Sequence, residues 1–215
     1  GNLVTSDNST VVTASIATGT NGSLTATVTA TAVAGVATFD GVKFVGTPLA
    51  NYRLDFKASG LTSVRSAQFS VTHNSPIKLT VKTQPVGLAT GSDLSTQPVL
   101  ELRDLFDNIA TSDSSTVVTA TVTTGNDSVL TGETATAENG IVTVDHLNLV
   151  GNPGEKYRIT FSVGDITVTS QDITVTHAAP AKLAIRTQPV GELTGELLAT
   201  APVIEVLDRF GNLAT

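Results

Sequence analysis

Internal repetition is the sequence feature that most constrains this chain. The stretch from Lys78 to Asp113 reads KLTVKTQPVGLATGSDLSTQPVLELRDLFDNIATSD, and it recurs from Lys182 as KLAIRTQPVGELTGELLATAPVIEVLDRFGNLAT. The first residues repeat the tail of that stretch, so that Asn2, Asn108 and Asn212 correspond at spacings of 106 and 104 residues. The chain therefore spans about two periods of a unit of roughly 105 residues, and residue 1 falls inside a unit.

Composition limits the class of protein and its partners. Of the 215 residues, 40% are hydrophobic and only 4% aromatic, and Thr and Val, which favour strands, are abundant. A formal net charge of −7 without a basic patch argues against nucleic acid or an anionic membrane as a partner. The sequence has no cysteine, which excludes disulfides and thiolate metal sites. It also has no signal peptide and no apolar run of about 18 residues, so we expect any export signal to lie outside it.

Hydrophobic residues alternate with polar ones along most of the chain, and this period of two predicts strands. The clearest case is 156–163, where Tyr157, Ile159 and Phe161 point one way and polar residues point the other. The alternation recurs at 51–58. Strands with one buried face and one solvent-exposed face predict antiparallel sheets in a sandwich or barrel. The fold class expected from this pattern is all-β.

Seven strands are predicted for the unit that the sequence contains in full. A unit of this length is about the size of one β-sandwich domain and can bury one core. Asn139-Gly140 is the strongest hairpin signal, because both residues accept positive φ. Further turns are expected at 125–127 and 164–165. The predicted strands cover, approximately, residues 77–83, 98–103, 116–124, 133–137, 142–149, 156–163 and 166–176.

The repeat predicts three segments. Residues 1–76 would be a partial repeat with its last five strands, 77–178 a complete repeat, and 179–215 a partial repeat with its first two strands. Short linkers that contain a proline, at 73–76 and 177–180, would limit bending between repeats. Three explanations fit the partial segments: the sequence is a window from a longer chain, strands of one copy complete another copy, or the unit boundary lies elsewhere.

Several motifs recur at fixed places in the repeat. They are TQPVG at Thr83 and Thr187, DRFGN at Asp208, GVATF at Gly35, and G-x-x-Y-x-[LI]-x-F around Tyr52 and Tyr157. Together they resemble the bacterial immunoglobulin-like repeats, of the invasin and intimin kind in the broad sense, that occur in tandem in large cell-surface or filament-forming proteins. Two places depart from this pattern: DNI stands at Asp107 in place of GN, and GIVTV at Gly140 in place of GVATF.

The resemblance implies tandem immunoglobulin-like β-sandwich repeats of about 105 residues in an extracellular protein of the bacterial surface. The implied function is a non-catalytic stalk, spacer or fibre-building unit. Two alternatives are a filament subunit assembled head-to-tail by strand donation, and an adhesin module that binds glycan or protein through its loops. The expected partners are neighbouring repeats or other copies of the chain, with no cofactor and no metal.

Acidic residues cluster in the turn after the second strand of the repeat. Asp104, Asp107 and Asp113 lie within ten residues, and Asp208 repeats Asp104. Oxygen ligands of this kind could bind Ca²⁺. Asp and Asn also stabilise turns by bonding to their own backbone, and we favour this interpretation because the spacing matches no EF-hand.

Other candidate residues favour structural roles. His73 and His177 share one repeat position beside the linkers, and His146 is expected in the fifth strand. Glu101 and Glu205 fall on outward strand positions, which argues against paired catalytic acids. An isopeptide bond would need a core-facing lysine, whereas Lys78, Lys82 and Lys156 point outward. Tyr52 and Tyr157 follow a Gly/Pro corner and resemble the tyrosine corner, whose hydroxyl bonds to nearby backbone.

Overall fold

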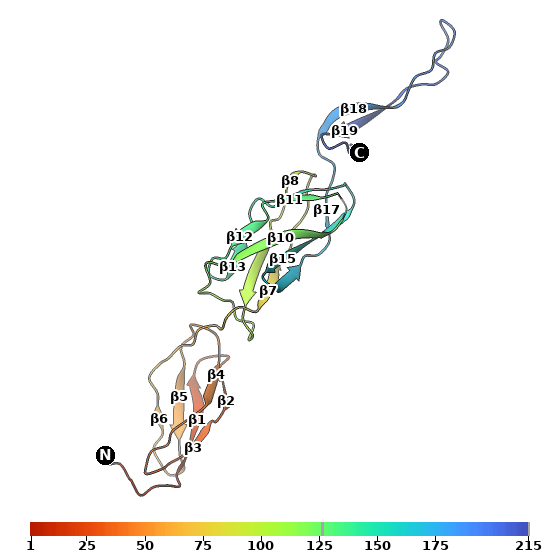
Figure 1. The fold of residues 1–215 in the computed structure, drawn as a ribbon. Helices are drawn as coiled ribbons and strands as arrows, with labels where there is room; N and C mark the ends of the chain where they lie inside the picture. Colours follow the sequence, from red (N-terminus) through yellow and green to blue (C-terminus); the bar gives the residue numbers. More distant parts are fainter. Residues whose placement is uncertain (126, 215) are drawn as a thin grey trace. The chain divides into compact units, whose positions relative to one another are not determined.

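A computed structural model describes residues 1–125 and 127–214 (Figure 1). Within this range the chain contains strands, turns and no helix, and all pairings between named strands are antiparallel. The predicted all-β fold class is confirmed. No described helix has the length and apolar character needed to span a bilayer. The predicted turn at 125–127 falls partly outside the described residues, because residue 126 is not among them.

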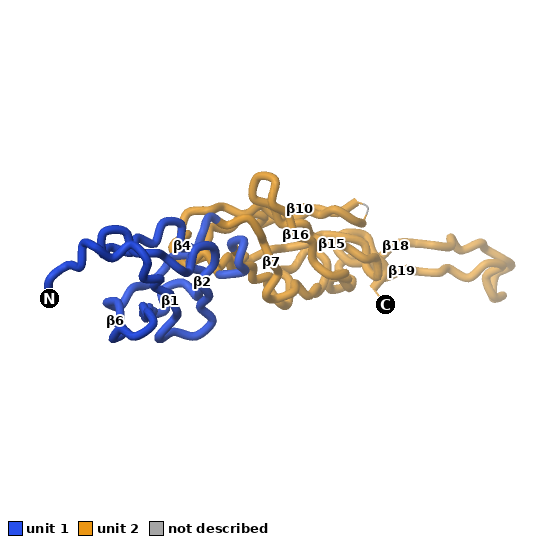
Figure 2. Tube along the Cα trace, turned by 90° about the horizontal axis from the view of Figure 1, so that it is seen from below, with its two compact units in different colours: residues 1–75, 104–108 blue, residues 76–103, 109–215 orange. Residues whose placement is uncertain are grey.

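The chain divides into two compact units, coloured separately in Figure 2. The first unit comprises residues 1–75 together with 104–108, and the second comprises 76–103 and 109–215. The short segment 104–108 is therefore a turn that packs with residues far from it in sequence. The division into three repeat segments, with its boundaries at 76 and 178, stays a prediction.

The first unit is built around a four-stranded sheet in the order β3-β1-β5-β6, with a separate pair, β2-β4. Its buried residues include Ala14 and Tyr52. Aromatic side chains fill the space around Tyr52, and the ring of Phe44 lies 4.5 Å from it, centroid to centroid. The strands are β1 (Val11–Thr18), β2 (Ser23–Ala26), β3 (Thr29–Thr31), β4 (Val42–Val45), β5 (Arg53–Lys57) and β6 (Val64–Arg65).

The second unit has a sheet in the matching order β12-β10-β15-β16, and β17 also pairs with β15. Three smaller sheets have the orders β13-β9-β7, β11-β14-β8 and β18-β19. The strands are β7 (Lys78–Thr83), β8 (Ser92–Asp93), β9 (Val99–Arg103), β10 (Val117–Thr124), β11 (Val129–Thr131), β12 (Thr134–Thr136), β13 (Ile141–Thr143), β14 (Asn148–Val150), β15 (Lys156–Val163), β16 (Ile166–Thr169), β17 (Ile173–Thr174), β18 (Pro180–Thr187) and β19 (Val203–Asp208).

The large sheets of the two units agree in register as well as in order. Val12 lies opposite Ala30 in the first unit, as Val118 lies opposite Ala135 in the second. The long first strand of each sheet also changes register near its end, after Ile16 in β1 and after Val122 in β10. The two sheets therefore share strand order, register and an irregularity at the corresponding position.

The core of the second unit lies between its large sheet and the sheet of β7, β9 and β13. Leu100 of β9, Val142 of β13 and Phe161 of β15 are fully buried within it. The alternation predicted for 156–163 is confirmed, because Tyr157, Ile159 and Phe161 have no exposed surface while Lys156 and Arg158, on the opposite face, are exposed.

Two predicted strands are each divided in the structure. The strand expected at 142–149 becomes β13 and β14, because β13 pairs with β9 whereas β14 pairs with β11 and β8. The strand expected at 166–176 is interrupted at Ser170, whose hydroxyl accepts a hydrogen bond from the backbone N–H of Ile159 at 3.0 Å. Strands β8 and β11 also lie in stretches expected to be loops. Hydrophobic alternation cannot reveal such changes of pairing partner.

The predicted turn at Asn139-Gly140 is confirmed, with φ of 52° and 75° at the two residues. The residues on either side, Glu138 and Ile141, form an antiparallel bridge. The flanking strands do not form a regular hairpin, however, because β12 pairs with β10 and β13 pairs with β9. The turn therefore moves the chain from one sheet to the other.

The tyrosine corner is also present in both units. The hydroxyl of Tyr157 accepts a hydrogen bond from the backbone N–H of Asn152 at 2.6 Å, and that of Tyr52 accepts one from Thr47 at 2.8 Å. A Cβ on Gly125 or Gly151 would lie 2.2 or 2.6 Å from the Tyr157 ring. The ring thus requires glycine on both sides, and the predicted role of this hydroxyl is confirmed.

Replacing Tyr157 with phenylalanine should lower the free energy of unfolding by about 1–2 kcal/mol, because the N–H of Asn152 loses its acceptor. Urea or thermal unfolding of the 215-residue chain measures the change. Tyr52→Phe should produce a loss of similar size through the first unit. An unchanged melting temperature in both variants would show that the hydroxyl has no role in stability.

Candidate functional site

The carboxylate of Asp104 gathers four hydrogen bonds. Its Oδ1 accepts from the backbone N–H groups of Phe106 and Asn108, both at 2.9 Å. Its Oδ2 accepts from the Asn108 side-chain amide at 3.2 Å and from the backbone N–H of Asn74 at 3.0 Å. Three bonds therefore close the turn itself, and the fourth joins the turn to the linker 30 residues earlier.

Asp208 makes the same four bonds in the second unit. Its Oδ1 accepts from the backbone N–H groups of Phe210 and Asn212 at 2.9 Å. Its Oδ2 accepts from the Asn212 side-chain amide at 3.0 Å and from the backbone N–H of Ala178 at 2.9 Å. We call this arrangement of one aspartate, its turn and one linker N–H the linker clasp.

Both clasp carboxylates are enclosed, with 2% of Asp104 and none of Asp208 exposed to solvent. Burial by itself would raise the pKa of each carboxyl group. The backbone and side-chain donors around Asp104 outweigh that effect, so its pKa lies below the ordinary value of 3.8. The same balance of burial against donated hydrogen bonds lowers the pKa of Asp208 further. Each clasp therefore holds an ionised carboxylate at neutral pH.

Side chains of the Asp208 turn extend the clasp within the second unit. The Arg209 guanidinium donates to the carbonyl oxygen of Gly91 at 2.8 Å and lies 4.6 Å from the centre of the Phe210 ring. A Cβ on Gly91 would lie 2.3 Å from the Phe210 ring, and Gly91 itself has a φ of 73°. Glycine is required there for conformation and for space. The turn thus contacts the loop that precedes β8.

In the first unit, the corresponding turn lines an open hollow of about 410 Å³. Phe106 and Asp104 contribute to it from the turn, and Phe44 and Gly46 contribute from β4 and the residue after it. The clasp turn thus forms one side of the hollow, and residues in and after β4 form another.

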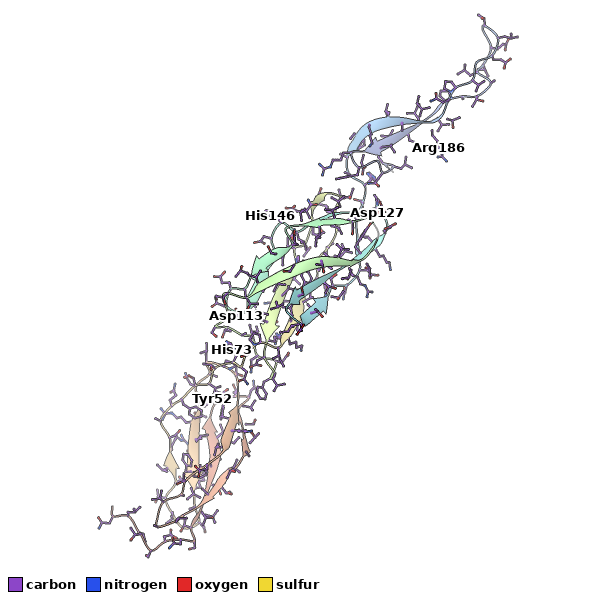
Figure 3. The ribbon with its side chains drawn as sticks, viewed as in Figure 1. Tyr52, His73, Asp113, Asp127, His146 and Arg186 are labelled. Atoms are coloured by element: carbon purple, nitrogen blue, oxygen red, sulfur yellow. The ribbon has the colours of Figure 1, made fainter. Side chains whose placement is uncertain are left out.

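The calcium hypothesis for these acidic turns is not supported by the positions of their oxygens. Both carboxylate oxygens of Asp104 and of Asp208 already accept hydrogen bonds from nearby donors. Asp113 (Figure 3) accepts from the backbone N–H groups of Ser115 and Thr116 at 3.1 and 3.0 Å. Across the described ranges, no group of three or more acidic or histidine side chains could hold a metal ion. Turn stabilisation, the interpretation favoured from the sequence, accounts for the carboxylates of Asp104, Asp113 and Asp208. The fourth aspartate of the hypothesis, Asp107, lies in the Asp104 turn with a φ of 66°, and its backbone N–H donates to the carbonyl oxygen of Asp104 at 3.1 Å.

The histidines separate into two kinds. The Nδ1 atoms of His73 and His177 lie 2.6 and 2.9 Å from the carbonyl oxygens of Asn74 and Ala178, the linker residues whose N–H groups enter the clasps. Their equivalent positions beside the linker thus have equivalent geometry.

His146 is placed differently from the sequence prediction. It lies in the turn between β13 and β14 with a φ of 60°, not within a strand, because the chain changes sheets there. Its Nδ1 is 2.9 Å from Oδ2 of Asp93, 53 residues away (His146 is labelled in Figure 3). This contact raises the pKa of His146 and lowers that of Asp93. The sequence carries no signal for a pair at this separation.

The glutamate and lysine candidates also have structural surroundings. Glu101 lies on the outer face of β9 as alternation requires, but it is only 7% exposed. The reason is that β9 is the central strand of its sheet, and Arg103 and Lys82 contact the Glu101 carboxylate from the same face. Lys82 and Lys156 are exposed, as the outward prediction for the lysines requires.

Comparison with known proteins finds only a weak similarity between this chain and solved structures. No family model and no curated protein matches the sequence. The whole chain aligns with the crystal structure of the S-layer protein rSbsC(31-844), with a TM-score of 0.35 and 15% identity over 25% of that chain. It aligns with domains 4–9 of surface layer protein SbsC with a TM-score of 0.33 and 17% identity over 30% of that chain. The sequence thus spans less than a third of either structure, and we argue function from its own residues.

Replacing Asp104 with asparagine should lower the free energy of unfolding at pH 7 by about 1.5–3 kcal/mol, since a charged acceptor of several hydrogen bonds is lost. In the unaltered chain this stabilisation is complete above the ordinary pKa of 3.8 and is lost as the pH falls through the lowered native pKa. Thermal unfolding from pH 7 to pH 2 measures both effects.

The control is Asp165→Asn, which removes the same charge from an exposed residue of the turn after β15. It should leave stability at pH 7 nearly unchanged. If Asp104→Asn and Asp165→Asn behaved alike, the clasp would have no stabilising role.

The His146–Asp93 pair should be visible by NMR. We expect His146 to titrate above its ordinary pKa of about 6.5, because Asp93 stabilises the protonated ring. The stabilisation is present at low pH and disappears as the pH rises through the raised pKa. Asp93→Asn should return the His146 pKa toward the ordinary value. A His146 pKa that does not respond to this change would contradict the pairing.

Proposed function

We propose that this chain is a non-catalytic structural module of a bacterial extracellular surface protein, made of immunoglobulin-like repeats that act as a stalk or spacer. The observation that carries this proposal is the linker clasp, which occurs at both linkers with the same donors and the same acceptor atoms. At each linker, the buried carboxylate holds one backbone N–H group in place, which fixes the path of the chain there.

The chemistry of the polar groups supports a mechanical role. The two most enclosed carboxylates accept hydrogen bonds from the backbone, and the enclosed Glu101 carboxylate contacts two cationic side chains. Carboxylates that are held by such contacts stabilise the fold. The Thr-rich strands and the net charge of −7 favour solubility of a repetitive chain outside the cell.

The clasp offers a way to restrict motion at a short linker. A linker of about four residues that contains proline is already semi-rigid. The N–H of Asn74 or Ala178 lies in the middle of each linker and is fixed to the turn that follows the next strand pair. Bending at the linker would require breaking a hydrogen bond to a buried charge, which costs about 1.5–3 kcal/mol. A spacer needs this resistance, whereas a flexible tether does not.

Distance measurements between spin labels test this function. Labels would be placed on single cysteines introduced at Lys43 of β4 and Thr131 of β11, both exposed, in a chain that has no other thiol. We expect a narrow distance distribution in the otherwise unaltered chain and a broad one in Asp104→Asn. Asp165→Asn is the control and should keep the narrow distribution. A broad distribution without any clasp substitution would overturn the spacer function.

A further inference from the structure

Residues 88–90 lie beside Thr176 in the one parallel pairing found among the described residues. The backbone N–H of Thr90 donates to the carbonyl oxygen of Thr176 at 2.8 Å. The N–H of Thr176 in turn donates to the carbonyl oxygen of Leu88 at 3.0 Å. Residues 88–90 follow β7, the first strand after one linker, and Thr176 comes just before the other linker. We call this contact the parallel pairing.

The side chain of Thr90 fixes one half of the parallel pairing to the residues around the end of β14. It is fully buried, and its hydroxyl donates to the carbonyl oxygen of Gly151 at 2.8 Å and accepts from the N–H of Gly151 at 2.9 Å. The next residue, Gly91, donates its N–H to the carbonyl oxygen of Leu149 at 3.0 Å. A buried hydroxyl that is satisfied in both directions by one backbone residue fixes the register of its segment.

Close backbone contacts hold the two segments against each other. A Cβ on Gly87 would lie 1.9 Å from the carbonyl oxygen of Thr174 in β17, so only glycine fits there. Gly87 is the last residue of the TQPVG motif that begins at Thr83. On the other segment, the N–H of Gly154 donates to the carbonyl oxygen of Val175 at 3.0 Å. Both halves of the parallel pairing are therefore also bound to the rest of the unit.

The other pairings of these two stretches are of a different kind. β7 pairs with β9, and β17 pairs with β15, and both pairs are antiparallel. Each of them connects one end of the second unit to a strand in its interior. The parallel pairing instead joins the first stretch of the unit directly to the last.

The direction of the two segments decides how this contact responds to tension. Tension along the chain pulls residues 88–90 toward the first linker and Thr176 toward the second. Because parallel segments run the same way, these pulls act along the segments in opposite directions and stretch both hydrogen bonds together. In a hairpin that is pulled from its open end, the bonds break one after another. Sliding of parallel segments therefore has the higher barrier.

We propose that the parallel pairing is the element of this module that resists tension, and that Thr90 is the positioning residue that keeps it in register. For residues 88–90 to slide past Thr176, the two hydrogen bonds between Thr90 and Gly151 must break as well. The inference rests on the spacer function, because only a module that is held at both ends carries tension.

The direction of pulling is the first test. Single-molecule tweezers would hold the 215-residue chain by two cysteines introduced at exposed positions, since it has no other thiol. Ser75→Cys with Ala179→Cys loads the parallel pairing. Glu138→Cys with Asp165→Cys loads β13 to β15 and leaves the parallel pairing outside the pulled segment. Unfolding under force reports the barrier to unfolding. We expect unfolding at constant force to be about tenfold slower with the first pair, because two hydrogen bonds must break together.

Removal of the Thr90 hydroxyl is the second test. Thr90→Val keeps the shape of the side chain and leaves the N–H and carbonyl oxygen of Gly151 unpaired. It should accelerate unfolding about tenfold when force is applied between residues 75 and 179, and much less between residues 138 and 165. Thr167→Val, which removes an exposed hydroxyl from β16, is the matched control and should change neither rate. Circular dichroism would show that both variants are folded.

Two results would overturn the proposal. One is an equal unfolding rate for the two directions of pulling, a comparison that needs no change at Thr90. The other is an equal acceleration of both rates by Thr90→Val, which would give Thr90 a general role in stability. Equal rates together with a narrow spin-label distribution would remove the tension-resisting role and leave the spacer function in place. A broad distribution together with unequal rates would do the reverse.

Discussion

A buried carboxylate that accepts four hydrogen bonds is the interaction on which the linkers of this chain depend. An isolated charge in the interior would be strongly unfavourable, so Asp104 and Asp208 are stable only where enough donors surround them. Aspartate suits the position because two oxygens on a short side chain can reach the turn and the linker together. The clasp therefore orders its turn and the linker residue together.

The sandwich core provides the complementary constraint. Leucine, isoleucine and phenylalanine from both sheets of the second unit are fully buried, and two glycines leave room for the Tyr157 ring at one end. In the first unit the corresponding side chains are partly exposed. The same residue pattern thus produces a closed core in one unit and an open face in the other. In the second unit, residues of β7 and β9 belong to the core that covers these side chains.

Sequence reasoning recovered what depends on neighbouring residues. Alternation located β15 and its buried face, Asn139-Gly140 located a turn, and the acidic turns were assigned to backbone bonding. It did not recover what depends on distant residues. The bond from Asp104 to Asn74 spans 30 residues and that from His146 to Asp93 spans 53. The division of β13 from β14 depends on pairing partners that periodicity does not encode.

The clasp binds the main chain of the linker, so it does not depend on which side chain the linker residue carries. Its linker donor is a backbone N–H, supplied by asparagine at one linker and by alanine at the other. Any residue except proline can supply that donor, so the linker sequence can drift through mutation while its geometry persists. The side chains that the clasp requires are the aspartate and the asparagine four residues later, whose amide donates to it. Two linkers of different sequence can therefore form the same clasp, as those at Asn74 and Ala178 do.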